Sequence, residues 1–202
     1  MKTNAKELQK ESNPFSSDDF RQCLETLRNG GVILYPTDTV WGIGCDATNE
    51  IAVKRIYEIK QRADSKAMLV LVDSTARIMN YVDTVPDIAW DLAEISEKPL
   101  TIIYPQAKNI AENLLAADKS IGIRVTAEPF SKKLCEMLRR PIVSTSANIH
   151  GLPTPKYFCE IDSLIKERVD YIVQYRQNDV TKSSPSSIIK VGINGEVKII
   201  RE

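Results

Sequence analysis

Histidine is nearly missing from this sequence, which has 202 residues and a single histidine, His150. A triad with a histidine base, an HExxH zinc site and a histidine proton relay all depend on that side chain, so one copy argues against each of them. Chemistry in this chain must therefore use lysine, arginine, serine, threonine, asparagine and carboxylate groups.

Cysteine is sparse as well, and its four copies are scattered as Cys23, Cys45, Cys135 and Cys159. None of them lies in a CxxC pair, so the spacing suggests neither a zinc site nor a disulfide framework. We expect buried, reduced thiols and no metal site made by the protein.

Long apolar runs are also absent. The opening MKTNAKELQKESNPF is polar and charged, unlike a signal peptide, and no later stretch is long enough to span a bilayer. These absences predict a cytoplasmic protein without a membrane partner.

The chain has no excess charge of either sign, because Lys plus Arg and Asp plus Glu both number 27. The molecule as a whole therefore cannot hold RNA or an anionic membrane non-specifically, and any anion site must be a local cluster. With 43% apolar residues, the length fits one domain. We place that domain at residues 16–202, after a polar leader of residues 1–15.

The apolar pattern changes repeatedly between helical and strand-like spacing. Helices are expected from Ser17, as the cap, to Asn29-Gly30-Gly31, at 49–62, at 86–96, from Pro129 onward, and at 161–169. Strands are expected at 32–35, 68–72, 100–104, 121–125, 142–145 and 171–174.

The segments 187–191 and 197–200 flank Asn194-Gly195, a favoured turn pair, and predict a closing antiparallel hairpin. That hairpin does not fit a repeated βαβ unit. We therefore predict one α/β domain of α+β character with a twisted sheet of parallel and antiparallel strands.

Four polar patches interrupt the apolar pattern, and each has a simple structural explanation beside a functional one. The segment Tyr35-Pro-Thr-Asp-Thr-Val-Trp-Gly-Ile-Gly44 can present hydroxyls and a carboxylate to a ligand, or form a capped turn with a packed tryptophan. Lys60-Gln61-Arg62, followed by Lys66, gathers cations as a triphosphate site without a P-loop requires. A solvated helix end is the simpler explanation of those cations.

The other two patches lie at strand-like runs. In Ile121-Gly-Ile-Arg-Val125 a lone arginine is either a carboxylate clamp or an exposed edge residue. Ser144-Thr-Ser-Ala-Asn148 can bind ribose or phosphate through hydroxyl, amide and backbone N–H groups, or form an ordinary turn.

The order and spacing of these patches resemble the YrdC/Sua5/YciO family of threonylcarbamoyl-adenylate synthases, from about Ser17 to the C-terminus. The resemblance also rests on Ser186-Ser-Ile-Ile189 and Ile200-Arg201. Without the extra C-terminal domain of the longer Sua5 form, the chain is similar to the short, YrdC-like form. The resemblance implies an α/β sheet wrapped around a large, positively lined cavity.

The resemblance also implies substrates and site residues. L-threonine would be held by Thr39, Arg124, Ser144 and Ser186, with Arg124 on its carboxylate. ATP would be held by Lys60, Arg62, Lys66, Ser120, Ser146, Asn148, Thr154 and Arg201. Lys60 and Arg62 would be the catalytic pair, acting electrostatically and without a covalent nucleophile.

The implied reaction joins threonine and bicarbonate-derived CO2 into a carbamate, which attacks the α-phosphorus of ATP and expels pyrophosphate. Mg²⁺ would accompany ATP and bridge its phosphates. The implied partners are a separate threonylcarbamoyl transferase complex that modifies tRNA, and a contact with tRNA or double-stranded RNA.

Several positions depart from the usual family pattern. Lys66 stands where many members have asparagine, and Leu71 where some have a threonine-contacting histidine. Pro185-Ser-Ser187 replaces the commoner Glu-Ser-Thr. Two alternatives stay open: an RNA-binding or ribosome-associated module without catalysis, and a YciO-like paralogue of weak or different activity. Intact Lys60-x-Arg62 and Ser146-Ala-Asn148 favour the synthase.

Overall fold

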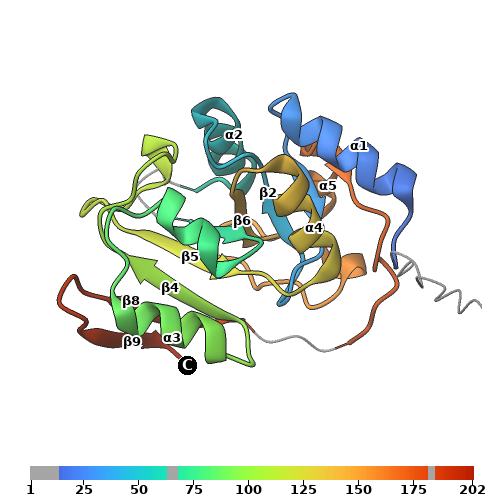
Figure 1. The fold of residues 1–202 in the computed structure, drawn as a ribbon. Coiled ribbons are helices and arrows are strands. Elements are labelled where there is room, and N and C mark those ends of the chain that lie inside the picture. The colour runs from blue at the N-terminus through green and yellow to red at the C-terminus, as the bar shows by residue number, and fades with distance from the viewer. Residues whose placement is uncertain (1–13, 63–67, 182–184) are drawn as a thin grey trace, which may run out of the picture.

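The computed structural model describes residues 14–62, 68–181 and 185–202, and within them nine strands form one mixed sheet (Figure 1). The strand order is β7-β1-β2-β6-β3-β5-β4-β8-β9. The strands are β1 (Ile33–Tyr35), β2 (Gly42–Gly44), β3 (Leu69–Val72), β4 (Leu100–Tyr104), β5 (Ile121–Val125), β6 (Ile142–Ser146), β7 (Tyr171–Ile172), β8 (Ser187–Val191) and β9 (Val197–Arg201). The predicted sheet of parallel and antiparallel strands is confirmed, since β1–β7, β3–β5 and β4–β8 are parallel pairs and the others are antiparallel.

The helices lie in the predicted segments, with ends that differ by one or two residues from those expected. They are α1 (Ser17–Arg28), α2 (Glu50–Lys60), α3 (Asp87–Ile95), α4 (Pro129–Leu138) and α5 (Ser163–Arg168), with 3-10 turns η1 (Thr75–Asn80), η2 (Glu112–Leu114) and η3 (Phe158–Glu160). The cap of α1 is Ser16 and not Ser17 as predicted, because the Ser16 side chain accepts from the backbone N–H of Asp19. Asn49 and Glu128 cap α2 and α4 in the same way.

Strand alternation gives the sheet two different faces. Val70, Val143, Ile123, Ile102 and Ile189 occupy paired positions on neighbouring strands and are all buried. Helices α3 and α4 pack on the sheet, and both lie in front of it in Figure 1. Positions one residue away point to the opposite face, and they carry Ser144, Gly122, Arg124, Thr101 and Ser186. The sheet therefore has one apolar face for the core and an opposite face on which polar groups lie among apolar ones such as Leu69 and Leu71.

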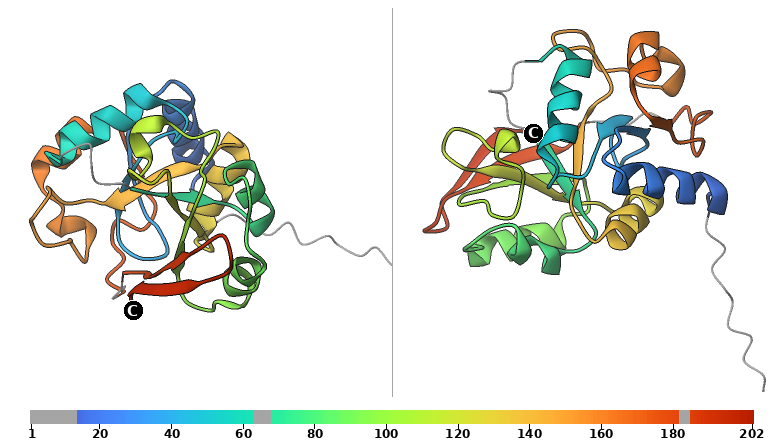
Figure 2. Two further views of the ribbon diagram at one scale, coloured as in Figure 1. Left: turned by 90° about the vertical axis from the view of Figure 1, so that its left-hand side faces the viewer. Right: turned by 90° about the horizontal axis from the view of Figure 1, so that it is seen from above.

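The two ends of the sheet are far apart. Figure 2 shows the β8–β9 hairpin on one side of the molecule and α1 on the other. The predicted hairpin is confirmed, and its turn contains Gly195 at φ 86°, a left-handed conformation that suits glycine. Beside α1, Phe15 and Phe20 form an aromatic cluster with Phe130 and Tyr175.

Some features differ from the expectations. Strand β2 was not predicted, because Gly42-Ile43-Gly44 has only one apolar side chain and its strand conformation depends on pairing with β1 and β6. Cys159 is exposed, whereas Cys23, Cys45 and Cys135 are the buried thiols expected. Residues 1–13 of the predicted leader lie outside the described residues.

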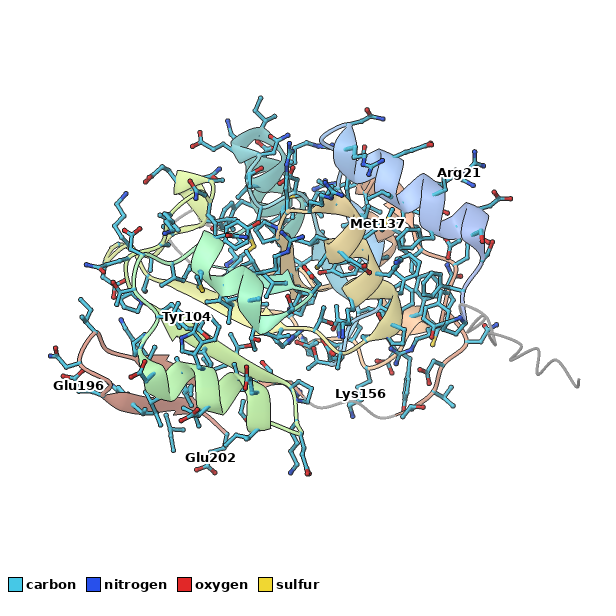
Figure 3. All side chains as sticks on the ribbon, viewed as in Figure 1. Arg21, Tyr104, Met137, Lys156, Glu196 and Glu202 are labelled. Atoms are coloured by element: carbon cyan, nitrogen blue, oxygen red, sulfur yellow. The ribbon has the colours of Figure 1, made fainter. Side chains whose placement is uncertain are left out.

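Side chains fill the space between helices and sheet, while Arg21 points outward from α1 and Met137 from α4 (Figure 3). None of the helices within the described residues has the length and hydropathy needed to cross a membrane.

Gly44 provides a test of this packing. A Cβ atom at Gly44 would lie 2.5 Å from the Val143 carbonyl oxygen and 2.6 Å from Cε1 of Tyr35. Because these neighbours are backbone and a buried ring, we expect Gly44→Ala to lower the free energy of unfolding by about 1–3 kcal/mol through overpacking. Denaturant unfolding would measure this change.

The control is Gly151→Ala, where a Cβ atom meets nothing within 4 Å and φ is 86°. That variant isolates the backbone penalty of about 1 kcal/mol. A smaller loss for Gly44→Ala than for Gly151→Ala would contradict the close contact at Gly44.

Candidate active site

The sheet face that carries Arg124 and Ser144 lines a cavity of about 320 Å³. It brings together eight of the residues expected at the site: Thr39, Arg62, Arg124, Ser144, Ser146, Thr154, Ser186 and Arg201. Thr37 and Gly42 also line it. None of the described residues that line the cavity is a histidine or a carboxylate. The cavity therefore offers hydroxyls and guanidinium groups.

Arg124 is the buried cation of the cavity, with 3% of its surface exposed. Burial lowers the pKa of this guanidinium, and the charge of Asp38 opposes that effect. Its Nε lies 3.6 Å from Oδ2 of Asp38 and has no hydrogen bond within the described residues. The Arg124 side chain is therefore not the exposed edge residue that the sequence left open.

The Asp38 carboxylate is surrounded by hydrogen-bond donors from other parts of the chain. Its carboxylate accepts hydrogen bonds from Thr126 Oγ1 at 2.7 Å and from the backbone N–H groups of Ala127 and Glu128 at 2.7 and 2.8 Å. With Arg124 on its remaining side, Asp38 is placed to orient neighbouring groups rather than to transfer a proton.

The segment that carries Asp38 is anchored at several points. Ser131 Oγ donates to the Pro36 carbonyl oxygen at 2.7 Å, and the Arg176 guanidinium lies 3.4 Å from the Thr37 carbonyl oxygen. The Arg176 guanidinium also lies 3.7 Å from buried Glu128, whose pKa burial raises. Loop 36–40 is thus held against the start of α4 and against residue 176.

Ser186 and Arg201 form another part of the cavity lining. Arg201 donates from Nε and Nη2 to the Ser186 carbonyl oxygen at 3.0 and 2.7 Å. The Ser186 hydroxyl lies 2.9 Å from the hydroxyl of Thr101, which is also buried. These bonds fix the start of β8 against the end of β9 and against β4.

Lys60 does not line the cavity but lies beneath it, with 2% of its surface exposed. Its Nζ donates to the Ser146 carbonyl oxygen and, at 2.7 Å, to that of Asn148. The Asn148 side chain in turn bonds the Ser146 hydroxyl and the Leu152 carbonyl oxygen, and it does not line the cavity either. Lys60 therefore ties the end of α2 to the loop after β6.

Ser120 lies in a second, apolar hollow of about 190 Å³ that adjoins the cavity. The two hollows share Met68, Leu69 and Ile188. The Ser120 hydroxyl bonds the Asp118 carboxylate, and Lys190 and this hydroxyl lower the pKa of Asp118 to about 2.

Two positions that depart from the family pattern have different places in the structure. Lys66 lies outside the described residues. Leu71 pairs with Arg124 across β3 and β5 but is completely buried and does not line the cavity. No described group of three or more His, Cys, Asp or Glu residues could hold a metal ion.

Sequence reasoning left Asp38 without a role and did not single out Thr101, Glu128 or Arg176. Their roles depend on partners 85 to 139 residues away, so no local pattern marks them. Thr37 lies in the sequence motif around Asp38, but the sequence alone does not show which groups its hydroxyl contacts.

The sequence and the fold of this chain are similar to those of known proteins. The family model of Sua5, YciO and YrdC, described as "Telomere recombination", matches residues 25–202. The chain belongs to the Sua5/YciO/YrdC family. A Pseudoalteromonas translucida protein named threonylcarbamoyl-AMP synthase is 36% identical over 177 residues, covering 86% of this chain and 93% of that relative. One of the same name from Photobacterium profundum is 32% identical, covering 78% and 86%.

Solved structures of the family share the fold. P. abyssi Sua5 superposes with a TM-score of 0.80 at 26% identity, over 90% of this chain and 55% of that chain. A structure of P. abyssi Sua5 complexed with L-threonine gives 0.76, over 85% and 50%. E. coli YciO gives 0.78 at 28% identity, over 91% and 88%. The chain thus spans about half the length of Sua5 and nearly all of YciO.

Asp38 and Arg124 give a test of the buried charges. Asp38→Asn removes the charge that faces a buried guanidinium, so we expect the free energy of unfolding to fall by about 2–4 kcal/mol. The matched control is Asp18→Asn, whose pair with Arg21 is 65–78% exposed, and which should change stability by less than about 1 kcal/mol. Equal effects in denaturant unfolding would contradict the anchoring role of Asp38.

Lys60 predicts a pH dependence of stability. Burial, and secondarily the charge of Arg62, lowers the pKa of Lys60 to about 7, against about 10.4 in an unfolded chain. Between those values the unfolded chain binds a proton that the folded chain does not, so stability rises with pH.

We therefore expect the free energy of unfolding of the wild type to rise relative to Lys60→Met from about pH 7 to about pH 10, with a constant difference below about pH 7. Denaturant unfolding of both proteins across that range gives the difference directly. Parallel profiles across the range would show that Lys60 titrates normally.

Proposed function

We propose that this protein converts L-threonine, bicarbonate and ATP into threonylcarbamoyl-AMP, pyrophosphate and water. The observation that carries the proposal is one cavity whose lining combines buried Arg124 and the hydroxyls of loop 36–40 with Arg62 and Arg201. One end suits an amino-acid carboxylate and the other a polyphosphate. Relatives of similar length carry the name of this enzyme.

The amino acid is assigned to the end that contains Arg124. A guanidinium that is buried beside a carboxylate binds a second carboxylate as a charge-assisted pair. Thr39, Ser144 and Ser186 supply hydroxyls around it and would position the remaining polar groups of L-threonine.

ATP is assigned to the end with Arg62, Ser146, Thr154 and Arg201. The phosphates would meet Arg62, while the adjoining apolar hollow beside Ser120 suits the adenine ring. Lys60 would contribute its charge from beneath, and Asn148 would orient Ser146. Lys66 is assigned to the phosphates through the family resemblance. Mg²⁺ would enter with ATP and be held by phosphates and water.

The chemistry needs positioning more than it needs a protein nucleophile. The threonine amine adds to CO2 derived from bicarbonate and loses a proton, which gives a carbamate. A carbamate oxygen then bonds the α-phosphorus as the bond to the bridging oxygen of pyrophosphate breaks. Arginine groups stabilise the charge that develops on the phosphoryl oxygens, and the cavity holds the two reacting groups next to each other.

The product is a labile mixed anhydride, so a further enzyme must use it promptly. We assign that step to a threonylcarbamoyl transferase complex acting on tRNA in the cytoplasm. A direct contact of this chain with tRNA or double-stranded RNA is a further partner to test.

Pyrophosphate release tests the proposal. Purified protein with ATP and Mg²⁺ should release pyrophosphate only when both L-threonine and bicarbonate are present. Release without threonine, or none at all from folded protein, would favour a paralogue of different activity or an RNA-binding module, and an RNA-binding assay would separate those two.

Arg62 provides the matched variant. Arg62→Met should reduce kcat/KM by about 100-fold, because it removes a donor for developing phosphoryl charge, while leaving the unfolding midpoint close to that of the wild type. Arg168→Met, an exposed arginine in α5 away from the cavity, is the control and should be fully active. Equal activity of the two variants would remove Arg62 from the phosphate site.

A further inference from the structure

The Thr37 hydroxyl makes every hydrogen bond available to it. Its oxygen lies 2.8 Å from the Val40 carbonyl oxygen, 3.1 Å from the backbone N–H of Thr39 and 3.1 Å from the Thr39 hydroxyl. A carbonyl oxygen can only accept and an amide N–H can only donate. The single proton of Thr37 therefore goes to Val40, and its two lone pairs accept from Thr39.

This pattern fixes the direction of the bond between the two hydroxyls. Since Thr37 has no second proton to give, Thr39 must be the donor, and its own proton points to Thr37. The lone pairs of the Thr39 oxygen have no other partner within the described residues, and Thr39 lines the cavity. Thr39 is thus set as a hydrogen-bond acceptor facing the ligand.

Loop 36–40 has several anchors besides the hydroxyl of Thr37. Ser131 already anchors the Pro36 carbonyl, Arg176 the Thr37 carbonyl, and three donors the Asp38 carboxylate. The additional bonds of Thr37 all converge on Thr39 and Val40, within the loop. Their specific effect is to orient Thr39.

We infer that Thr37 is a positioning residue that makes Thr39 an obligate acceptor, so that the cavity selects an amino acid with a donor group facing Thr39. This inference rests on the proposed function. Arg124 supplies donors for a carboxylate at one point of the ligand, and Thr39 accepts an N–H or O–H at another. A ligand with a carboxylate but no donor at that second point would be bound less well.

Thr37→Val removes the hydroxyl at nearly constant volume, and Thr37→Ser keeps it. One neutral hydrogen bond corresponds to roughly a tenfold change in affinity. We expect Thr37→Val to raise the KM for L-threonine about tenfold, with kcat changed less than about threefold and the KM for ATP unchanged. Thr37→Ser should restore the KM for L-threonine.

Two analogues identify the group that Thr39 accepts. L-2-aminobutyrate lacks the hydroxyl of threonine, and 3-hydroxybutanoate lacks the amine without putting another donor in its place. Each is measured as a competitive inhibitor against L-threonine. For the wild type, loss of the accepted group should weaken binding about tenfold. For Thr37→Val, loss of the same group from the inhibitor should change its binding little, because the acceptor on Thr39 is no longer oriented.

A double mutant shows whether Thr37 acts through Thr39. In a Thr39→Val background, adding Thr37→Val should leave the KM for L-threonine unchanged, since interacting residues are non-additive. Independent effects that multiply, or a Thr37→Val variant with wild-type KM and wild-type discrimination between the analogues, would overturn the inference. If Thr37→Val fails to fold, the analogue preferences of Thr37→Ser and Thr39→Val decide the matter. Unchanged preference in Thr39→Val would overturn it.

Failure of the proposed function is a separate result. A wild type that neither releases pyrophosphate with L-threonine nor binds L-threonine in a calorimetric titration refutes the function itself. If the wild type does both, and Thr37→Val has the KM and the analogue discrimination of the wild type, only the role of Thr37 is refuted.

Discussion

A guanidinium buried on an inner strand of a sheet needs a carboxylate nearby, because an uncompensated buried charge is strongly destabilising. Arg124 occupies such a position, and Asp38 supplies the carboxylate from loop 36–40. Asp38 must itself be satisfied, and it draws in Thr126 and the backbone that begins α4. The position of the loop, the start of α4 and the orientation of the buried cation are therefore one linked arrangement.

The two faces of the sheet allow this arrangement to exist beside a core. The residues before and after Arg124, Ile123 and Val125, point to the helix-covered side, so the polar positions share a face without interrupting the apolar packing. In the same way, Leu69 of β3 pairs with Ser144 of the neighbouring strand β6 and with Gly122 of the other neighbouring strand, β5. A one-residue shift of β5 would exchange the faces and bury the ligand groups in the core.

Much of this could be predicted from local sequence and some could not. Apolar periodicity and caps marked most helices and strands, and an arginine inside an apolar strand marked Arg124 as unusual. Strand β2 was missed because a Gly-Ile-Gly segment has almost no periodicity of its own and is extended only through its neighbours. The depth of Lys60 and the partners of Asp38 depend on residues about 90 positions away, and local patterns carry no information at that range.

Lys60 illustrates how a charge can serve a site without lining it. Its ammonium lies under the loop after β6, where two carbonyl oxygens accept from it, and burial lowers its pKa to about 7. A polyphosphate bound above that loop would favour the protonated form, because an anion stabilises a nearby cation most where water is excluded. The same side chain would then both shape the loop through its hydrogen bonds and add positive charge when the anionic substrate arrives. Arg62, two residues later, reaches the cavity wall itself, so the end of α2 supplies one cation beneath the site and one within it.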